Sequence, residues 1–69
     1  MLGAYIHELR GMKGMSIGKL EKASGVSKSY ISKLERGVHA KANVDIICRL
    51  ADALGKDRLV FVIESGILD

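Results

Sequence analysis

The sequence predicts an all-α protein, a compact bundle of four to five short helices. Three observations favour this class. Proline, which interrupts helices, is absent from the 69 residues. Hydrophobic residues make up 48% of the chain and aromatic residues only 4%, so the core must consist of aliphatic side chains, which suit packed helices. Apolar residues also recur at helical spacing in segments that each end at a glycine.

The first and fourth helices are each predicted to end at a glycine. The first is predicted over residues 2–13 and ends at Gly14. Residues 37–43 are predicted to form a loop, after which Asn43 can cap a fourth helix that ends at Gly55. The apolar stripes of these helices are Ile6 and Leu9 in the first and Ile46, Ile47, Leu50, Ala51 and Leu54 in the fourth.

Two very short helices lie between them, each opened by a serine and closed by a glycine. Ser16 and Gly25 bound the second helix, and Ser27 and Gly37 bound the third. Their inward side chains are Ile17, Leu20 and Ser24 in the second helix and Ile31 and Leu34 in the third. The connection between them is so short that the helices must cross steeply, which predicts a helix-turn-helix arrangement.

The tail after residue 56 is predicted to contain a β-strand, with a fifth helix as the alternative. Its apolar run favours a strand and comprises Leu59, Val60, Phe61, Val62 and Ile63. An unpaired strand edge on so small a chain needs cover, and pairing with a second copy would supply it. We therefore expect residues 1–56 to form a helix-turn-helix domain and residues 57–69 a tail that forms a homodimer.

Charge is unevenly distributed along the chain, although the net charge is only +3. Residues 13–41 hold seven lysines and arginines against two acidic residues, whereas residues 42–69 hold three against five. A basic middle segment of this kind is typical of a phosphate-binding surface.

The third helix carries the residues that suit contact with DNA. Ile31 and Leu34 lie on the face of this helix that packs on the core. The outward residues are therefore Lys28, Ser29, Ser32 and Lys33. An α-helix fits the major groove of B-form DNA, where lysine can donate to guanine and serine can pair with several bases. The pattern predicts a recognition helix.

The segment GVSKSYISKLERG at residues 25–37 resembles the Cro and lambdoid phage repressor family of helix-turn-helix proteins, also called the Xre-like family. The resemblance covers residues 6–55 and implies a lambda repressor-like bundle with the third helix as recognition helix. Outside that segment it is carried by Leu9, Arg10, Met15, Ser16, Leu20, Ala23, Leu50, Ala51, Ala53, Leu54 and Gly55.

The resemblance also implies roles for individual residues. Base contacts fall on Lys28, Ser29 and Lys33, with Ser27 and Ser32 beside them. Phosphate contacts fall on Lys41 and Asn43. Beyond the resemblance, we also expect phosphate contacts from Ser16, Lys19 and Arg36. Arg10 and Glu35 match a structural ion pair between the first and third helices.

Two positions depart from the family pattern. Ile17 stands where the family usually has a glutamine that meets a phosphate, so that contact is lost and Ser16 or Lys19 takes over the anchoring. Glu21 stands where the family prefers alanine between the second and third helices. Either the two helices sit slightly apart, or Glu21 bends to solvent towards a nearby lysine.

Other classes of function find little support. His7 and His39 lack partners at metal-ligand spacing, and no motif of catalysis or cofactor binding is present, so we expect no metal, no cofactor and no enzyme. Cys48 is the only cysteine and is expected to be a small buried residue. No apolar run is long enough to span a membrane and no targeting segment is visible, so a cytoplasmic protein is expected.

The leading hypothesis is a dimeric, sequence-specific DNA-binding transcriptional regulator, a repressor, whose partners are double-stranded DNA and a second copy of itself. The alternative is a DNA-binding antitoxin that holds a toxin partner, because antitoxins that resemble this family often carry a strand after the fourth helix. A restriction-modification controller is a third hypothesis.

Overall fold

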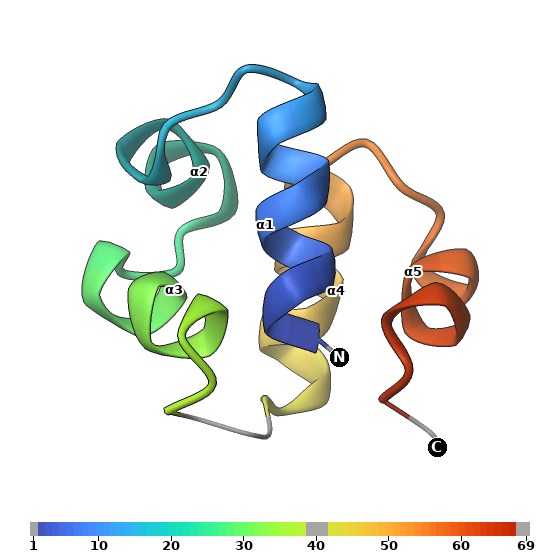
Figure 1. The fold of residues 1–69 in the computed structure, drawn as a ribbon. Helices are drawn as coiled ribbons and strands as arrows, with labels where there is room; N and C mark the ends of the chain where they lie inside the picture. Colours follow the sequence, from blue (N-terminus) through green and yellow to red (C-terminus); the bar gives the residue numbers. More distant parts are fainter. Residues whose placement is uncertain (1, 39–41, 68–69) are drawn as a thin grey trace.

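The computed structural model describes residues 2–38 and 42–67. The helices are α1 Leu2–Met12, α2 Ile17–Ser24, α3 Lys28–Glu35, α4 Val44–Ala53 and α5 Arg58–Ser65 (Figure 1). No strand occurs in these two ranges, and the prediction of an all-α bundle is confirmed.

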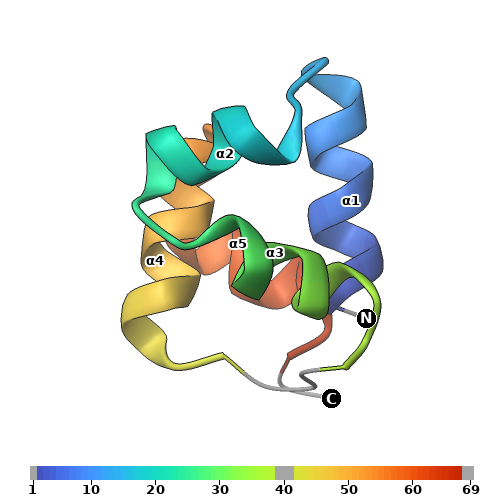
Figure 2. The same ribbon diagram turned by 90° about the vertical axis from the view of Figure 1, so that its left-hand side faces the viewer.

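The helices enclose one core. α1 and α4 stand apart, with the α2–α3 pair on one side of them and α5 on the other (Figures 1 and 2). α1 packs on α3 and α5, α4 packs on α2 and α5, and α2 packs on α3. The side chains that are almost wholly buried between them are Ile6, Leu20, Ile31, Leu34, Leu50, Ala51, Leu54 and Phe61.

Three of the helices begin at the polar residues predicted to cap them. Ser16, Ser27 and Asn43 each accept a hydrogen bond from the backbone amide three residues later, at 3.1, 3.1 and 2.8 Å. Each bond satisfies an amide that has no partner within its helix. The starts of α2, α3 and α4 are therefore determined locally by the sequence.

Cys48 is partly exposed, contrary to the expectation that it is buried. The buried residues of α4 are Ile47, Leu50 and Ala51. Cys48 lies next to this stripe and not on it, because successive helical residues are turned by about 100°.

The prediction that the tail forms a β-strand is wrong, and the alternative of a fifth helix is right. The Asp57 carboxylate accepts hydrogen bonds from two amides of the first turn, at 2.9 and 3.2 Å, and so starts α5. Phe61 and Ser65, one turn apart, are both buried, whereas Leu59 and Ile63 are exposed. A strand would place Leu59, Phe61 and Ile63 on the same face. Capping and core packing thus override the strand propensity of these residues.

Helix formation also changes which tail residues are available to a partner. Phe61 is fully buried in the core of its own chain, and Val62 packs against that core. Leu59, Val60 and Ile63 remain exposed, by 67%, 39% and 62%. The five apolar residues of the tail therefore do not share one free surface.

α5 is held to α1 by polar and aromatic contacts. The Tyr5 hydroxyl donates to Glu64 Oε1 at 2.6 Å, and the Lys56 ammonium donates to the same oxygen at 3.1 Å. The Tyr5 ring also meets Phe61 edge-on, with centroids 5.2 Å apart. Burial, together with the Glu64 carboxylate, raises the pKa of Tyr5 to about 12. Tyr5 is therefore neutral at physiological pH and acts as the donor.

α1 and α3 meet backbone to backbone at Gly3. A Cβ atom at Gly3 would overlap the carbonyl oxygen of Leu34 and would lie 3.1 Å from the Cα and carbonyl oxygen of Glu35. Backbone atoms cannot move aside as a flexible side chain can, so the close approach requires glycine at this position.

We predict that Gly3→Ala lowers the free energy of unfolding by ~1 to 3 kcal/mol, because α1 must shift away from α3. Gly11→Ala is the matched control, since it lies in the same helix and a Cβ there would meet nothing within 4 Å. It should stabilise the protein by up to ~1 kcal/mol, the difference in helix propensity. Urea denaturation of both variants measures the effect, and an equal change in the two would contradict the proposed overlap.

Candidate nucleic-acid interface

The turn between α2 and α3 is fixed by its own hydrogen bonds. Gly25 ends α2 with a φ of 76°, and its amide donates to the Glu21 carbonyl at 2.8 Å. The buried Ser24 hydroxyl donates to the Leu20 carbonyl at 2.6 Å and accepts from the Val26 amide at 3.1 Å. Val26 is itself buried. These contacts determine the angle at which α3 leaves α2.

The Glu21 side chain of α2 links the turn to the first residue of α3. Its carboxylate accepts a hydrogen bond from the backbone amide of Lys28 at 2.8 Å. Of the alternative that Glu21 bends to solvent towards a nearby lysine, only the direction is found. Glu21 is half-buried, and it contacts the backbone amide of Lys28 and not the ammonium group. A negative charge at the first turn of α3 is favourable, because helix N-termini carry partial positive charge.

The five residues predicted to read bases lie at the start and on the outer side of α3. Ile31 and Leu34 are buried beneath them. Ser27, Lys28, Ser29 and Lys33 are exposed, and Ser32 is half-buried. α3 forms an outer face of the molecule together with α2 (Figure 2). The structure therefore brings these short polar and cationic side chains together on one helix.

The residues predicted to contact phosphates lie around α3. Ser16 and Lys19 are exposed in the first turn of α2, Arg36 is exposed directly after α3, and Asn43 is exposed before α4. Lys41 lies outside the described residues, as does His39.

Arg10 and Glu35 form a bidentate ion pair between α1 and the end of α3. Arg10 Nε lies 2.8 Å from Glu35 Oε2, and Arg10 Nη2 lies 2.9 Å from Oε1. The two side chains are only 15% and 8% exposed. Arg10 Nη1 also donates to the Met15 carbonyl at 2.8 Å, so the same guanidinium holds the connection between α1 and α2.

His7 makes a contact with Glu35 that the sequence did not indicate, because the two residues come together only when α1 packs on α3. Its Nδ1 lies 3.0 Å from Glu35 Oε1 and 3.2 Å from Arg10 Nη2. Burial opposes ionisation of Glu35, but the hydrogen bonds from Arg10 and His7 outweigh it and lower the pKa of this carboxyl. Glu35 is therefore an anion that the Arg10 guanidinium and the hydrogen bond with His7 stabilise.

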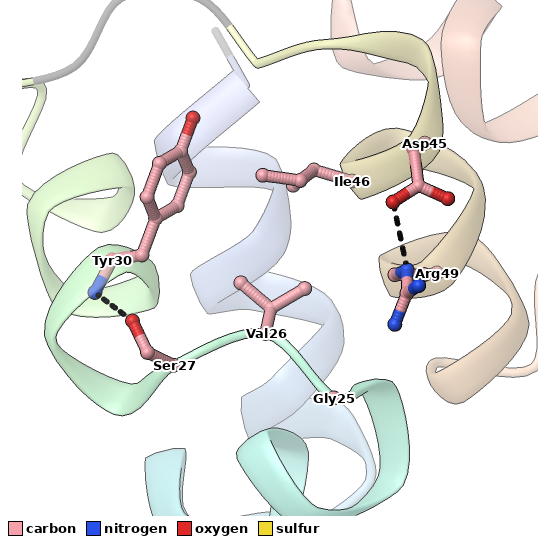
Figure 3. A pocket seen from close by; sticks show the side chains of 7 residues that line it. All are labelled: Gly25, Val26, Ser27, Tyr30, Asp45, Ile46 and Arg49. Atoms are coloured by element: carbon pink, nitrogen blue, oxygen red, sulfur yellow. Dashed lines mark hydrogen bonds and ion pairs between the residues drawn. The ribbon is translucent and has the colours of Figure 1, made fainter.

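Two hollows flank α3. One, of about 400 Å³, lies between the turn and α4. Tyr30 and Ile46 form its walls, and Arg49, held by Asp45 at 2.9 Å, points over Gly25 (Figure 3). The other, of about 720 Å³, lies between α1, the start of α2 and α3. Its lining includes His7, Ile17, Ser32, Glu35 and Arg36.

In residues 2–38 and 42–67, no three His, Cys, Asp or Glu side chains are grouped so as to hold a metal ion. Within the same ranges no helix is long and apolar enough to cross a membrane.

We predict that Glu35→Gln lowers the free energy of unfolding at neutral pH by about 3 kcal/mol, because it leaves Arg10 without its anionic partner in a largely buried site. A carboxyl with a lowered folded-state pKa contributes stability above its unfolded pKa and loses it as pH falls through the folded value. The variant and the unmodified protein should therefore converge in stability on acidification.

The control for this prediction is Asp45→Asn, which removes the same charge from the exposed pair with Arg49. Exposed pairs contribute ~0 to 1 kcal/mol, so this variant should melt close to the unmodified protein. Thermal melts at neutral pH and at about pH 3.5 make the comparison. An unchanged melting temperature of Glu35→Gln would show that the pair does not hold α1 to α3.

Comparison with known proteins supports the assignment made from the fold. The helix-turn-helix family matches residues 6–61. The transcriptional regulator SlrR of Bacillus subtilis is 46% identical over 54 residues, which are 78% of this chain and 36% of SlrR. SinR of the same organism is 32% identical over 54 residues, covering 78% of this chain and 49% of SinR. An uncharacterized helix-turn-helix transcriptional regulator of Mycobacterium tuberculosis, Rv0474, is 34% identical over 67 residues. These residues are 97% of this chain and 47% of Rv0474.

A solved structure agrees with these matches. The clp gene regulator ClgR from C. glutamicum superposes with a TM-score of 0.79 at 34% identity, covering 93% of this chain and 82% of that chain. The chain spans about a third to a half of the length of the three regulators matched by sequence. The matched range of 6–61 includes every helix-turn-helix element described above, so the chain belongs to the Cro/C1-type, Xre-like helix-turn-helix family.

Proposed function

We propose that the chain is a sequence-specific DNA-binding transcriptional regulator, which binds an inverted-repeat operator as a homodimer. The observation that carries this proposal is the outer face of α3. Lys28, Ser29 and Lys33 are exposed there, while Ile31 and Leu34 fix the helix to the core. The relatives named as transcriptional regulators support the same function. Such a protein acts in the cytoplasm, on the DNA of its cell.

In this proposal α3 enters the major groove with its first turn leading. Lys28 and Lys33 donate to guanine O6 and N7, and the serine hydroxyls pair with neighbouring bases. Lys19 and Arg36 on either side neutralise phosphates, which positions the helix without reading sequence. The hydrogen bond from the Lys28 amide to Glu21 keeps the leading turn of α3 in place during this contact.

The exposed apolar residues of α5 support a homodimer. Leu59, Val60 and Ile63 lie within one eight-residue helix. Neighbouring exposed apolar side chains of this kind mark interaction surfaces. α5 and α3 lie on opposite sides of α1 and α4, so a second copy on α5 leaves α3 free (Figure 1). Two copies then present two recognition helices to half-sites about 34 Å apart.

We propose repression as the sign of regulation, because a dimer bound over a promoter blocks access to it without any further contact. The antitoxin hypothesis rested on a strand after the fourth helix, and the described residues 58–65 form a helix instead. Nothing else in the described part of the chain favours a toxin partner or a restriction-modification role over a regulator.

Selection of binding sites from a random duplex pool, followed by sequencing, tests the proposed function. We expect an inverted repeat with half-sites about one helical turn apart. Lys28→Ala should then weaken binding to this site by ~1 to 3 kcal/mol and relax the preference at one base pair.

Lys13→Ala is the control for this charge change, since the Lys13 ammonium lies beside Gly55, at the end of α4. It should leave the base preference intact. Equal losses on selected and random DNA for Lys28→Ala would argue against base reading by α3, and a pool without any enriched site would argue against the proposed function.

The dimer is tested by the double variant Leu59→Gln and Ile63→Gln. These residues are 67% and 62% exposed, so the monomer should fold as before. We expect the sedimentation mass at tens of micromolar to fall from two chains to one and the affinity for the inverted repeat to fall with it. Met12→Gln, at a residue 76% exposed in α1, should remain dimeric. A monomeric mass for the unmodified chain would refute the dimer.

A further inference from the structure

Ile17 is an apolar residue at the edge of the proposed DNA-binding surface. It is the first residue of α2 and is half-buried, so part of its side chain packs on the core and part reaches the surface. The exposed part lines the hollow of about 720 Å³ that Ser32 of α3 and Arg36, directly after α3, also line.

The position of this hollow follows from its neighbours. In the proposed function, Ser32 faces base edges and Arg36 faces a phosphate. A surface between these two residues lies where the edge of the major groove meets the protein. α2 and α3 also form one face of the molecule, with α1 beside it (Figure 2). The exposed part of Ile17 shares this hollow with Ser32 and Arg36, so in the proposed function it lies beside the groove that α3 enters.

The chemistry of Ile17 restricts what it can contact there. An isoleucine side chain neither donates nor accepts a hydrogen bond, so it cannot anchor a phosphate or read a polar base edge. Thymine is the only base of unmodified DNA that presents a methyl group in the major groove, at its C5 position. Ser32 is small, and the hollow beside it leaves room for such a group.

We propose that Ile17 is a specificity-determining residue that contacts the C5-methyl of one thymine in each operator half-site. This inference rests on the proposed function and names one base that the chain selects. Burial of the methyl group between Ile17 and Ser32 removes apolar surface from water, which favours thymine at this position over cytosine. The contact adds a base preference to those supplied by the lysines of α3.

The experiment uses the duplex recovered from the random pool. Each thymine is replaced in turn by deoxyuridine, which keeps the base pair and removes only the methyl group. For the unmodified chain, we expect one replacement per half-site to weaken binding about three- to fivefold, the effect of one buried methyl group. For Ile17→Ala, the same replacement should have no effect.

Two further variants make the result specific. Ile17→Gln keeps a side chain of similar length but is polar, and it should also lose the response to deoxyuridine, which covers the case that Ile17→Ala folds poorly. Met12→Ala removes an exposed apolar side chain from the end of α1 and should keep the response.

The inference is overturned if no thymine replacement weakens binding of the unmodified chain, if the half-site contains no thymine, or if the Ile17 variants respond as the unmodified chain does. In each of these cases an enriched operator still upholds the proposed function. A random pool without an enriched site overturns the proposed function itself and this inference with it.

Discussion

The orientation of α3, the proposed recognition helix, depends on one largely buried ion pair, Arg10 with Glu35. A single guanidinium contacts the carboxylate at the end of α3 and the Met15 carbonyl before α2. The Arg10 guanidinium therefore fixes the positions of both α2 and α3 relative to α1. A charge pair with so little exposure is costly to break, because either partner alone would remain poorly solvated.

Other contacts hold α3 at both of its ends and support the Arg10–Glu35 pair. Gly3 lets α1 approach the last turn of α3 closely enough for the guanidinium to reach Glu35. At the opposite end, Glu21 and Ser27 satisfy the first amides of α3. α3 has only two turns and would not be stable alone. It is held at both ends, so its outer face makes few contacts within the chain and remains exposed for the proposed contact with DNA.

The sequence predicted what depends on neighbouring residues and missed what depends on packing. Caps such as Ser16 and Ser27 act over three residues, so the starts of α2 and α3 were predictable. The tail is wrongly predicted as a strand because the strand propensity of its residues does not reveal that Phe61 fills the core. The contacts of Gly3 and His7 reach from α1 to α3, and no local pattern indicates them.

The fold separates two kinds of surface. Exposed lysine and serine side chains lie on α2 and α3, whereas Leu59, Val60 and Ile63 are exposed on α5. The α2–α3 pair and α5 lie on opposite sides of α1 and α4 (Figure 1). α5 is tied to α1 through Tyr5 and Glu64, and α1 is tied to α3 through Arg10. In the proposed dimer, a second copy that covers α5 would therefore contact an element that α1 fixes to α3. In the proposed dimer this rigid connection sets the spacing of the two recognition helices, so that the geometry of the operator follows from the packing of α1.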